Sequence, residues 1–279
     1  MSIPKVAKAG SDVASVFAAL QDSMTTLQPW LAPFRTLAER LIAAQGDSVA
    51  QALNLVRSPS NSIVEFVPQS ALPEGEAYEA YIAKTSCVPT RDNLHDLFNG
   101  IMWLTFPHTK RRMNLLQAEE IARAGIAGSR GALRDALTVF DENGAILQAP
   151  SCLRSALREK DWNALFIANR DAWQSARLVL FGHALLEKLM RPRKAMTAHV
   201  WCVDEISDAA LAASLMPEQL VEKPFSPLPV LGVPGWCAAN QDPQFYRDAA
   251  VFRSRSTPRS ENEFDMENEE SDATQRTQR

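Results

Sequence analysis

Residues 137–147 read LTVFDENGAIL, and they carry the strongest local fold signal in the chain. Two short runs of β-prone residues flank Asn143 and Gly144, the residue pair that type I′ turns favour in β-hairpins. This stretch therefore predicts a β-hairpin near the middle of the chain.

Further strand and helix patterns surround this stretch. Short apolar runs at residues 63–67 (IVEFV), 177–181 (RLVLF) and 197–203 (TAHVWCV) are typical of strands. Apolar residues at helical spacing predict helices within residues 11–56, 78–84, 93–106, 108–124, 151–172 and 182–190, with Asp92 as the expected N-cap of the third. The sequence therefore predicts a helix-rich α+β protein with a small sheet, in one globular domain over residues 11–254.

The end of the chain has a different composition. Residues 216–240 are crowded with proline and glycine, which forbids long regular elements. The aromatic residues Phe225, Trp236, Phe245 and Phe252 remain available as apolar anchors, so this segment is predicted to wrap over the core. Residues 1–10 are predicted to be flexible, and the polar, acidic residues 255–279 are predicted to be a disordered tail.

Composition and charge narrow the possible functions. With 279 residues, of which 46% are hydrophobic, the chain can bury a sizeable core. The net charge of -4 lacks the basic excess that is typical of nucleic-acid or anionic-membrane binding. No signal-peptide core and no run of roughly 20 apolar residues is present, so the sequence predicts a cytoplasmic protein without membrane contact. The four cysteines form no Cys-x-x-Cys pair, and reduced thiols are expected.

Residues 91–110, RDNLHDLFNGIMWLTFPHTK, carry the most unusual polar pattern. At about 100° per residue, Asp96 and Asn99 lie on one side of the predicted helix with His95 at its edge. Trp103 and Phe106 fall on this same side, so the polar side is not expected to face open water along its length. Two interpretations stay open: a half-buried cleft wall that binds a ligand, or polar residues that anchor the helix to neighbouring loops.

Other polar residues extend the cleft interpretation. His183 and Glu187 are one helical turn apart and face one point, while His199 lies in an alternating strand. Convergence of these residues predicts a divalent metal bound by His95, His183 and His199. The candidate catalytic residues are His95, Asp96, Asn99, His183 and Glu187. Asp141 and Glu142 are interpreted instead as solvated residues of the hairpin turn.

A second candidate is an anion pocket. Arg130 and Arg134 lie in the small-residue segment GSRGALRD, residues 128–135, and Arg91 and Lys110 are further basic residues of the polar helix region. Guanidinium groups in such a setting indicate a small anionic ligand. A solvated charged face explains the same pattern.

Four motifs also resemble a known family: residues 88–114 (VPTRDNLHDLFNGIMWLTFPHTKRRMN), 130–147 (RGALRDALTVFDENGAIL), 181–188 (FGHALLEK) and 228–253 (LPVLGVPGWCAANQDPQFYRDAAVFR). They are similar, in the same order, to a bacterial protein family catalogued as a domain of unknown function. The resemblance covers about residues 60–254 and implies a bacterial cytoplasmic protein. It brings no activity, ligand or site residue with it.

Two functional hypotheses follow from the residues. The first is a cytoplasmic metal-dependent hydrolase with a polar cleft of histidine, aspartate and asparagine side chains. The alternative is a non-enzymatic binding or regulatory protein in which the same side chains are structural.

Overall fold

The computed structural model describes residues 13–26, 28–44, 46–58, 63–124 and 131–254. The predicted flexible N-terminus (residues 1–10), the predicted disordered tail (residues 255–279) and Arg130 lie outside the described residues. The prediction that residues 11–254 form one domain stays a prediction.

The chain opens with three helices and a 3-10 turn, as the apolar spacing predicted: α1 (Val13–Thr25), η1 (Pro29–Phe34), α2 (Arg35–Ala44) and α3 (Val49–Val56). Ser48 caps α3, because its side chain accepts a hydrogen bond from the amide of Gln51. Asp92 also belongs to this helix terminus, since its Oδ1 accepts from the amide of Val49 at 2.8 Å. The N-cap of the later polar helix is therefore Asn93, not Asp92 as predicted, and Asn93 accepts from the amide of Asp96.

A small parallel sheet and two long helices follow. The strands β1 (Glu65–Pro68) and β2 (Cys87–Thr90) pair in parallel, and α4 (Tyr78–Thr85) connects them. The polar stretch forms α5 (Leu94–Thr105) and continues into α6 (Pro107–Ala124). Gly100 lets α5 lie close to α3, because a Cβ at this position would come within 2.3 Å of Leu53 Cδ1.

The predicted β-hairpin over residues 137–147 is wrong. Helix α7 (Ala132–Asn143) runs through its first half, and β3 (Gly144–Gln148) begins only after Asn143. Gly144 has φ −73° and ψ 155°, whereas a type I′ turn requires a positive φ at both central residues. A helix forms instead of the hairpin because Leu137 and Phe140 lie on the buried face of this helix, where Phe140 stacks on Phe181.

The main sheet has four strands in the order β4-β3-β5-β6. The three other strands are β4 (Arg177–Leu180), β5 (Thr197–Cys202) and β6 (Ser226–Pro229), and the helices between them are α8 (Ser151–Glu159), α9 (His183–Lys188), α10 (Asp208–Ser214) and α11 (Pro217–Val221). The central strand β3 is antiparallel to β4 and parallel to β5. This sheet and the helices confirm the predicted α+β class.

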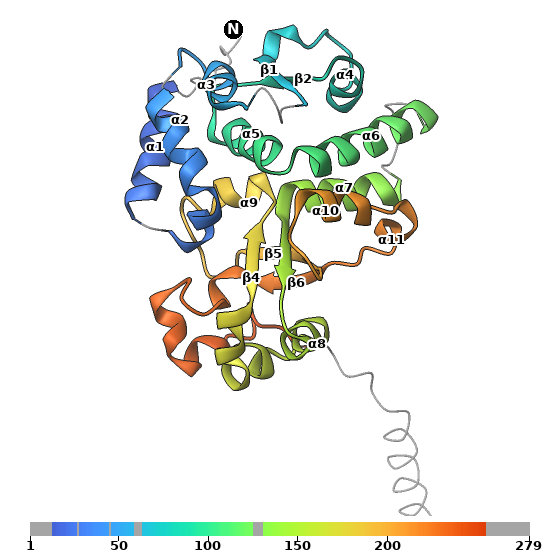
Figure 1. The fold of residues 1–279 in the computed structure, drawn as a ribbon. Coiled ribbons are helices and arrows are strands. Elements are labelled where there is room, and N and C mark those ends of the chain that lie inside the picture. Colours follow the sequence, from blue (N-terminus) through green and yellow to red (C-terminus); the bar gives the residue numbers. More distant parts are fainter. Residues whose placement is uncertain (1–12, 27, 45, 59–62, 125–130, 255–279) are drawn as a thin grey trace, which may run out of the picture.

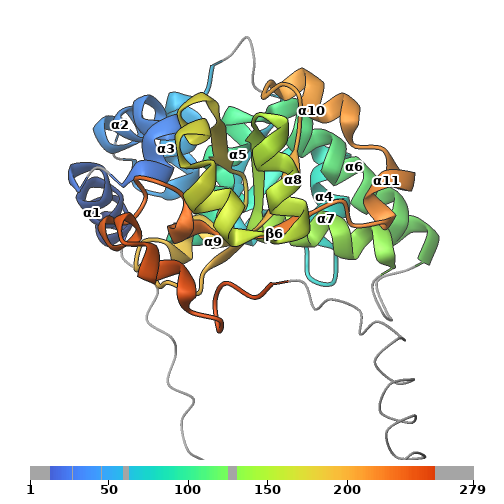
Figure 2. The same cartoon turned by 90° about the horizontal axis from the view of Figure 1, so that it is seen from below.

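The elements lie in layers (Figure 1). The helices α5 and α6 lie between the two-stranded sheet and the layer that contains α9 and α7, and the four-stranded sheet lies on the far side of that layer. In the view from below, α1–α3 and the pair α10 and α11 occupy opposite sides of the molecule (Figure 2). The interface between α5, α7 and α9 is therefore in the middle of the fold.

The proline-rich end contains only short elements, as predicted: after α11 and β6 come the 3-10 turns η5 (Val230–Gly232), η6 (Ala238–Gln241) and η7 (Pro243–Arg247). Trp236, a predicted anchor, is only partly buried and lies 5.9 Å from Trp30 between ring centroids. Leu228, Val230 and Asn240 of this segment are fully buried, and Asn240 Nδ2 donates to the carbonyls of Leu231 and Val233. The predicted anchor Phe252 is also buried, so both apolar contacts and hydrogen bonds hold this segment.

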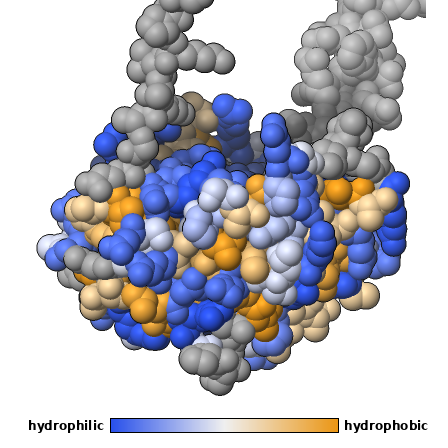
Figure 3. All heavy atoms as spheres, turned by 90° about the horizontal axis from the view of Figure 1, so that it is seen from above, coloured by the Kyte–Doolittle hydropathy of each residue, from blue (hydrophilic) through white to orange (hydrophobic). Residues whose placement is uncertain are grey.

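The surface gives no sign of a membrane-spanning helix. Among the described helices, none combines the length and apolar character needed to cross a bilayer. On the face seen from above, hydrophilic and hydrophobic residues are interspersed rather than gathered on separate sides (Figure 3).

Candidate metal centre

Three elements bring polar side chains to one place in the middle of the fold. His95 comes from the first turn of α5, Glu142 from the last turn of α7, and His183 from the first residue of α9. Gly182 permits this approach, because a Cβ there would lie 2.5 Å from the Cα of Asn143. The amide of Gly182 also donates to the carbonyl of Gly144 at 2.8 Å, which fixes the start of α9 against the end of α7.

The two histidines face each other through the same ring atom. The Nε2 atoms of His95 and His183 are 3.0 Å apart, and the rings meet edge to face. On its other side, His95 Nδ1 lies 3.0 Å from Glu187 Oε2. Glu142 Oε2 lies 3.7 Å from His183 Nε2, and the donor atoms of His95, His183 and Glu142 all lie within 4.8 Å of one another.

Burial sets the charge of these groups. His183 is 4% exposed, and burial lowers its pKa to about 4, so its imidazole is neutral at pH 7. Burial and the nearby Asp141 raise the pKa of Glu142 above its usual range. A neutral imidazole is the form that binds a metal ion, and a bound cation would favour the charged form of Glu142.

A second polar network adjoins this group. Lys110 is buried and donates to Asp141 Oδ1 and, at 2.9 Å, to Asn99 Oδ1. Asn99 in turn donates to the hydroxyl of Tyr78 at 3.1 Å. Burial alone would raise the pKa of Asp141, but the charge and the hydrogen bond of Lys110 outweigh it and hold that pKa below its usual range. Burial raises the pKa of Tyr78, whose phenol is therefore neutral.

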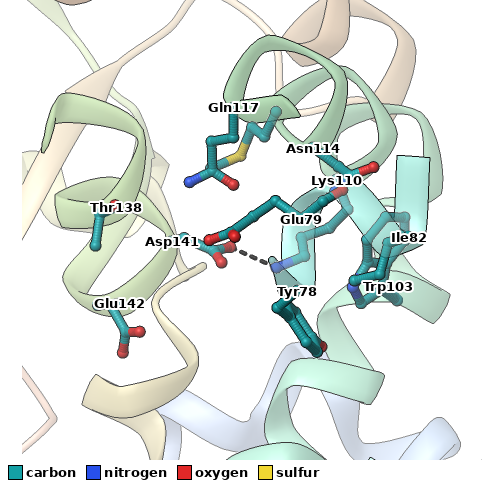
Figure 4. Close-up of a pocket in the computed structure, with 11 residues that line it drawn as sticks. Tyr78, Glu79, Ile82, Trp103, Lys110, Asn114, Gln117, Thr138, Asp141 and Glu142 are labelled. Carbon is teal, nitrogen blue, oxygen red and sulfur yellow. Dashed lines mark hydrogen bonds and ion pairs between the residues drawn. The ribbon is translucent and has the colours of Figure 1, made fainter. Parts of the chain in front are cut away.

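Two cavities open onto these residues. The larger has a volume of about 330 Å³ and contacts both networks; it is lined by Gln69, Leu72, Tyr78, Glu79, Arg91, His95, Asp96, Asn99, Asp141, Glu142 and His183. The smaller, of about 120 Å³, lies on the Lys110 side (Figure 4). Tyr78, Glu79, Asp141 and Glu142 line both, so the two cavities are neighbours.

The donor atoms of the first group fit a divalent metal ion. Two imidazole nitrogens and a carboxylate oxygen are the protein ligands of many catalytic zinc sites, which keep a further position open. Nitrogens at about 2.0–2.1 Å from one zinc ion in tetrahedral geometry are about 3.3 Å apart, and the observed separation of the two Nε2 atoms is 3.0 Å. The contact between His95 and Glu187 matches the carboxylate that commonly orients a metal-binding histidine.

The structure brings together three of the residues predicted for catalysis, namely His95, His183 and Glu187. Asp96 lines the larger cavity, but both of its oxygens accept hydrogen bonds from Arg91. Asn99 also lines the larger cavity, but its side chain is hydrogen-bonded to Lys110 and Tyr78. Asp96 and Asn99 thus have the contacts of structural residues.

His199 does not join the metal-binding group, although it was predicted to be a ligand. It lies in the middle of β5, opposite Gly144 in the register, and among the described residues the third member of the group with metal-ligand spacing is Glu142. Burial and the charge of Lys223 lower the pKa of His199. His199 does not join the group because the pairing of β5 with its neighbouring strands fixes the position of His199 within the sheet.

The predicted anion pocket is not assembled by the residues that the structure describes. Arg134 lines neither cavity, and Arg91 and Lys110 are paired with the carboxylates of Asp96 and Asp141. Their positive charges are thereby offset. Arg130 lies outside the described ranges.

Sequence reasoning missed the contribution of Asp141 and Glu142. Both were assigned to a solvated turn because Asn143 and Gly144 follow them. The available signal was the helical spacing of Leu133, Leu137 and Phe140, which continues to the end of α7 and places the two carboxylates in its last turn.

Comparison with known proteins gives one match. Residues 64–256, well over half of the chain, match the model of a family described as a protein of unknown function (DUF3025). No curated protein and no solved structure matches the chain.

Proposed function

The chain belongs to this DUF3025 family, and we propose from the site itself that it is a metal-dependent hydrolase. His95, His183 and Glu142 would hold a divalent ion, and the larger cavity would admit the substrate. The observation that carries the proposal is the pair of Nε2 atoms that face each other at 3.0 Å beside a carboxylate.

A hydrogen bond between the two rings is the competing explanation of this contact. If His95 donates from Nδ1 to Glu187 and is neutral, its Nε2 has no proton to donate. His183 would then have to donate from Nε2, which leaves its Nδ1 as an unprotonated nitrogen that is buried and has no partner in the described structure. A shared cation lets both Nε2 atoms act as electron-pair donors, and the proton of His183 then sits on Nδ1, 3.9 Å from Asp141 Oδ2.

The chemistry would be divided between the ion and the surrounding side chains. A bound divalent ion lowers the pKa of a water molecule and polarises a substrate oxygen. Glu187 holds His95 in the tautomer with a free Nε2, and Lys110 holds Asp141 as a carboxylate next to His183. Among the described residues, Arg91 lines the larger cavity and Lys110 lines the smaller one, and each is paired with a carboxylate. The carboxylates of the cavity walls therefore favour a neutral or cationic substrate over a phosphate.

We also place this activity in the cytoplasm of a bacterial cell, as the family resemblance implies. All four cysteines are unpaired, which is usual in a reducing compartment.

Titration of the metal-free protein with Co²⁺ tests the proposal, because tetrahedral cobalt gives visible absorption that reports the ligands. We expect one ion per chain. The variants His183→Gln and Glu142→Gln should each weaken Co²⁺ binding by at least about tenfold, because loss of a residue that merely orients a metal ligand already has an effect of this size. His199→Gln is the matched control and should bind like the parent.

Equal cobalt binding by the parent and all three variants would sink the metal-site proposal. It would favour the alternative, a binding or regulatory protein in which the histidines hold α5 and α9 together.

A further inference from the structure

The smaller cavity contains a carboxylate that forms no ion pair within the described structure. Glu79 lies in the first turn of α4 and lines this cavity. Among the residues described, no side chain forms an ion pair or hydrogen bond with its carboxylate, whereas the neighbouring Asp141 is paired with Lys110. Figure 4 shows Glu79 directed into the cavity towards Asp141.

A buried amide faces the same space. Gln117, from α6, is only 9% exposed, and its side chain has no hydrogen-bond partner within the described structure. In Figure 4 its amide group points into the cavity above Glu79. An amide that is unpaired and faces a cavity offers both a donor and an acceptor to a molecule bound there. It is an observation independent of the carboxylates.

Asn114, one helical turn before Gln117, adds to this observation. It is 4% exposed, lines the cavity, and donates from Nδ2 to the backbone carbonyl of Glu79. Its Oδ1 accepts no hydrogen bond from any described residue. The cavity therefore has acceptor groups in excess of donors.

The charges and the lining residues of the smaller cavity indicate which kind of ligand it would bind. Lys110 and Asp141 offset each other, so the carboxyl groups of Glu79 and Glu142 give the smaller cavity an excess of acidic groups over basic ones. The ring of Trp103 forms part of the wall and already contacts an ammonium group, since Lys110 Nζ lies 5.5 Å from its centroid. A carboxylate or phosphate would be repelled, whereas an ammonium group would satisfy Glu79 and Gln117 together.

We propose that the smaller cavity binds a protonated primary amine of the substrate, next to the centre where the bond is cleaved. This inference rests on the proposed function, because it assigns the cleaved bond to the neighbouring metal centre. The volume of about 120 Å³ accommodates an ammonium group on a short alkyl chain and little more. The shared wall of Tyr78, Glu79, Asp141 and Glu142 places the two parts of the substrate side by side.

Three small probes of similar size test the subsite: propylammonium, 1-propanol and propionate, each titrated into the Co²⁺-treated full-length protein and followed by ligand-observed NMR. We expect propylammonium to bind, and 1-propanol and propionate to bind at least about tenfold more weakly, because only the ammonium forms charge-assisted hydrogen bonds. Equal binding of propylammonium and 1-propanol would overturn the proposal.

Two variants test whether propylammonium binds in the smaller cavity. Glu79→Gln and Gln117→Leu should each weaken propylammonium binding, by about tenfold for the loss of the charge and by less for the amide. The control Glu76→Gln removes the same charge three residues earlier, where Glu76 lies near Lys84 and outside both cavities. An unchanged affinity in both cavity variants would overturn the proposal, and Gln117→Leu decides the matter if Glu79→Gln fails to fold.

The same samples separate this inference from the proposed function. Glu79→Gln should bind Co²⁺ like the parent, because Glu79 is not among the metal-binding group. Cobalt binding without propylammonium binding would overturn the amine subsite alone. Propylammonium binding that depends on Glu79 in a protein that binds no cobalt would support the cation subsite and overturn the hydrolase proposal.

Discussion

His95 is held at both of its ring nitrogens, with Nδ1 against Glu187 and Nε2 against His183, each at 3.0 Å. The contact with Glu187 decides which nitrogen carries the proton, and so whether Nε2 can donate an electron pair. In the proposed metal site, Glu187 would therefore control whether His95 can bind the ion, without itself being one of the proposed ligands.

Glu187→Ala should therefore weaken metal binding by about 10–100-fold, as expected for the loss of a group that orients a histidine ligand. Its side chain is 42% exposed, so the variant should unfold at nearly the same denaturant concentration as the parent. Glu187→Gln keeps a hydrogen-bond acceptor and should fall between the two in a Co²⁺ titration. A parent-like affinity of the alanine variant would show that Glu187 does not orient His95.

The sequence predicted part of this residue set. His183 and Glu187 stand one helical turn apart, and His95 stands at the edge of a polar helix face, so spacing alone identified them. Asp96 and Asn99 share that face but are satisfied by Arg91 and by Lys110, contacts that spacing cannot show. Residue type and period indicate which side chains can meet, and only the packing decides which partner each side chain takes.

At the scale of elements, the junction of α7 and α9 determines the positions of Glu142 and His183, two of the proposed metal ligands. A methyl group on Gly182 would meet only backbone atoms, the nitrogen and Cα of Asn143 and the carbonyl oxygen of Glu142, at 2.5–2.6 Å. Backbone atoms at a helix end cannot move aside as a flexible side chain can. The two helices would have to separate.

Gly182→Ala is expected to lower the free energy of unfolding by about 1–3 kcal/mol, the usual cost of overpacking. It should also weaken Co²⁺ binding, because it moves His183 away from Glu142. Gly131→Ala, at the other end of α7, is the control for metal affinity, since its nearest contact would be Glu120 Oε2 at 3.8 Å. Measurement combines urea denaturation with cobalt titration of the folded protein, and unchanged cobalt affinity in Gly182→Ala would contradict this account of the junction.

Element prediction succeeded for the helices α5 and α6 and failed at residues 137–147, where a short motif competed with the apolar period. The helix predicted over residues 151–172 was too long, because α8 ends at Glu159. The helices α5 and α6 follow the predicted ranges closely, with Pro107 at their boundary. The Asn143-Gly144 pair is equally compatible with a hairpin turn and with the end of a helix, and burial of Phe140 selected the second. Local turn signals are weak when tertiary packing can use the same residues differently.

At the scale of the whole molecule, the C-terminal segment is attached to the rest of the chain by polar contacts. Asn240 is 0% exposed; its Nδ2 donates to two carbonyls of the same segment, and its Oδ1 accepts from Arg170, seventy residues earlier. The proline-rich composition predicted the absence of long elements here, but no local pattern could identify a partner so distant in the sequence.

Asn240→Ala should lower the free energy of unfolding by about 2–4 kcal/mol, because it removes two hydrogen bonds to backbone carbonyls and one from the Arg170 guanidinium at a fully buried position. Metal affinity of the folded protein should stay unchanged, since Asn240 lines neither cavity of the site. The exposed neighbour Gln241→Ala is the control and should change stability by no more than about 0.5 kcal/mol. Equal urea midpoints for the two variants would show that Asn240 does not anchor the segment.

The two histidines that face each other are 88 residues apart and belong to different layers of the fold. An ion shared by them would therefore act as a removable cross-link between helices α5 and α9, one that the cell could open or close through its supply of metal. Transient separation of the two helices would become rarer in the loaded protein, and backbone amides on both would exchange with deuterium more slowly, while those of α8, at the opposite end of the fold in Figure 1, would keep their rate. Metal availability would then set the rigidity of the middle of the molecule as well as its chemistry.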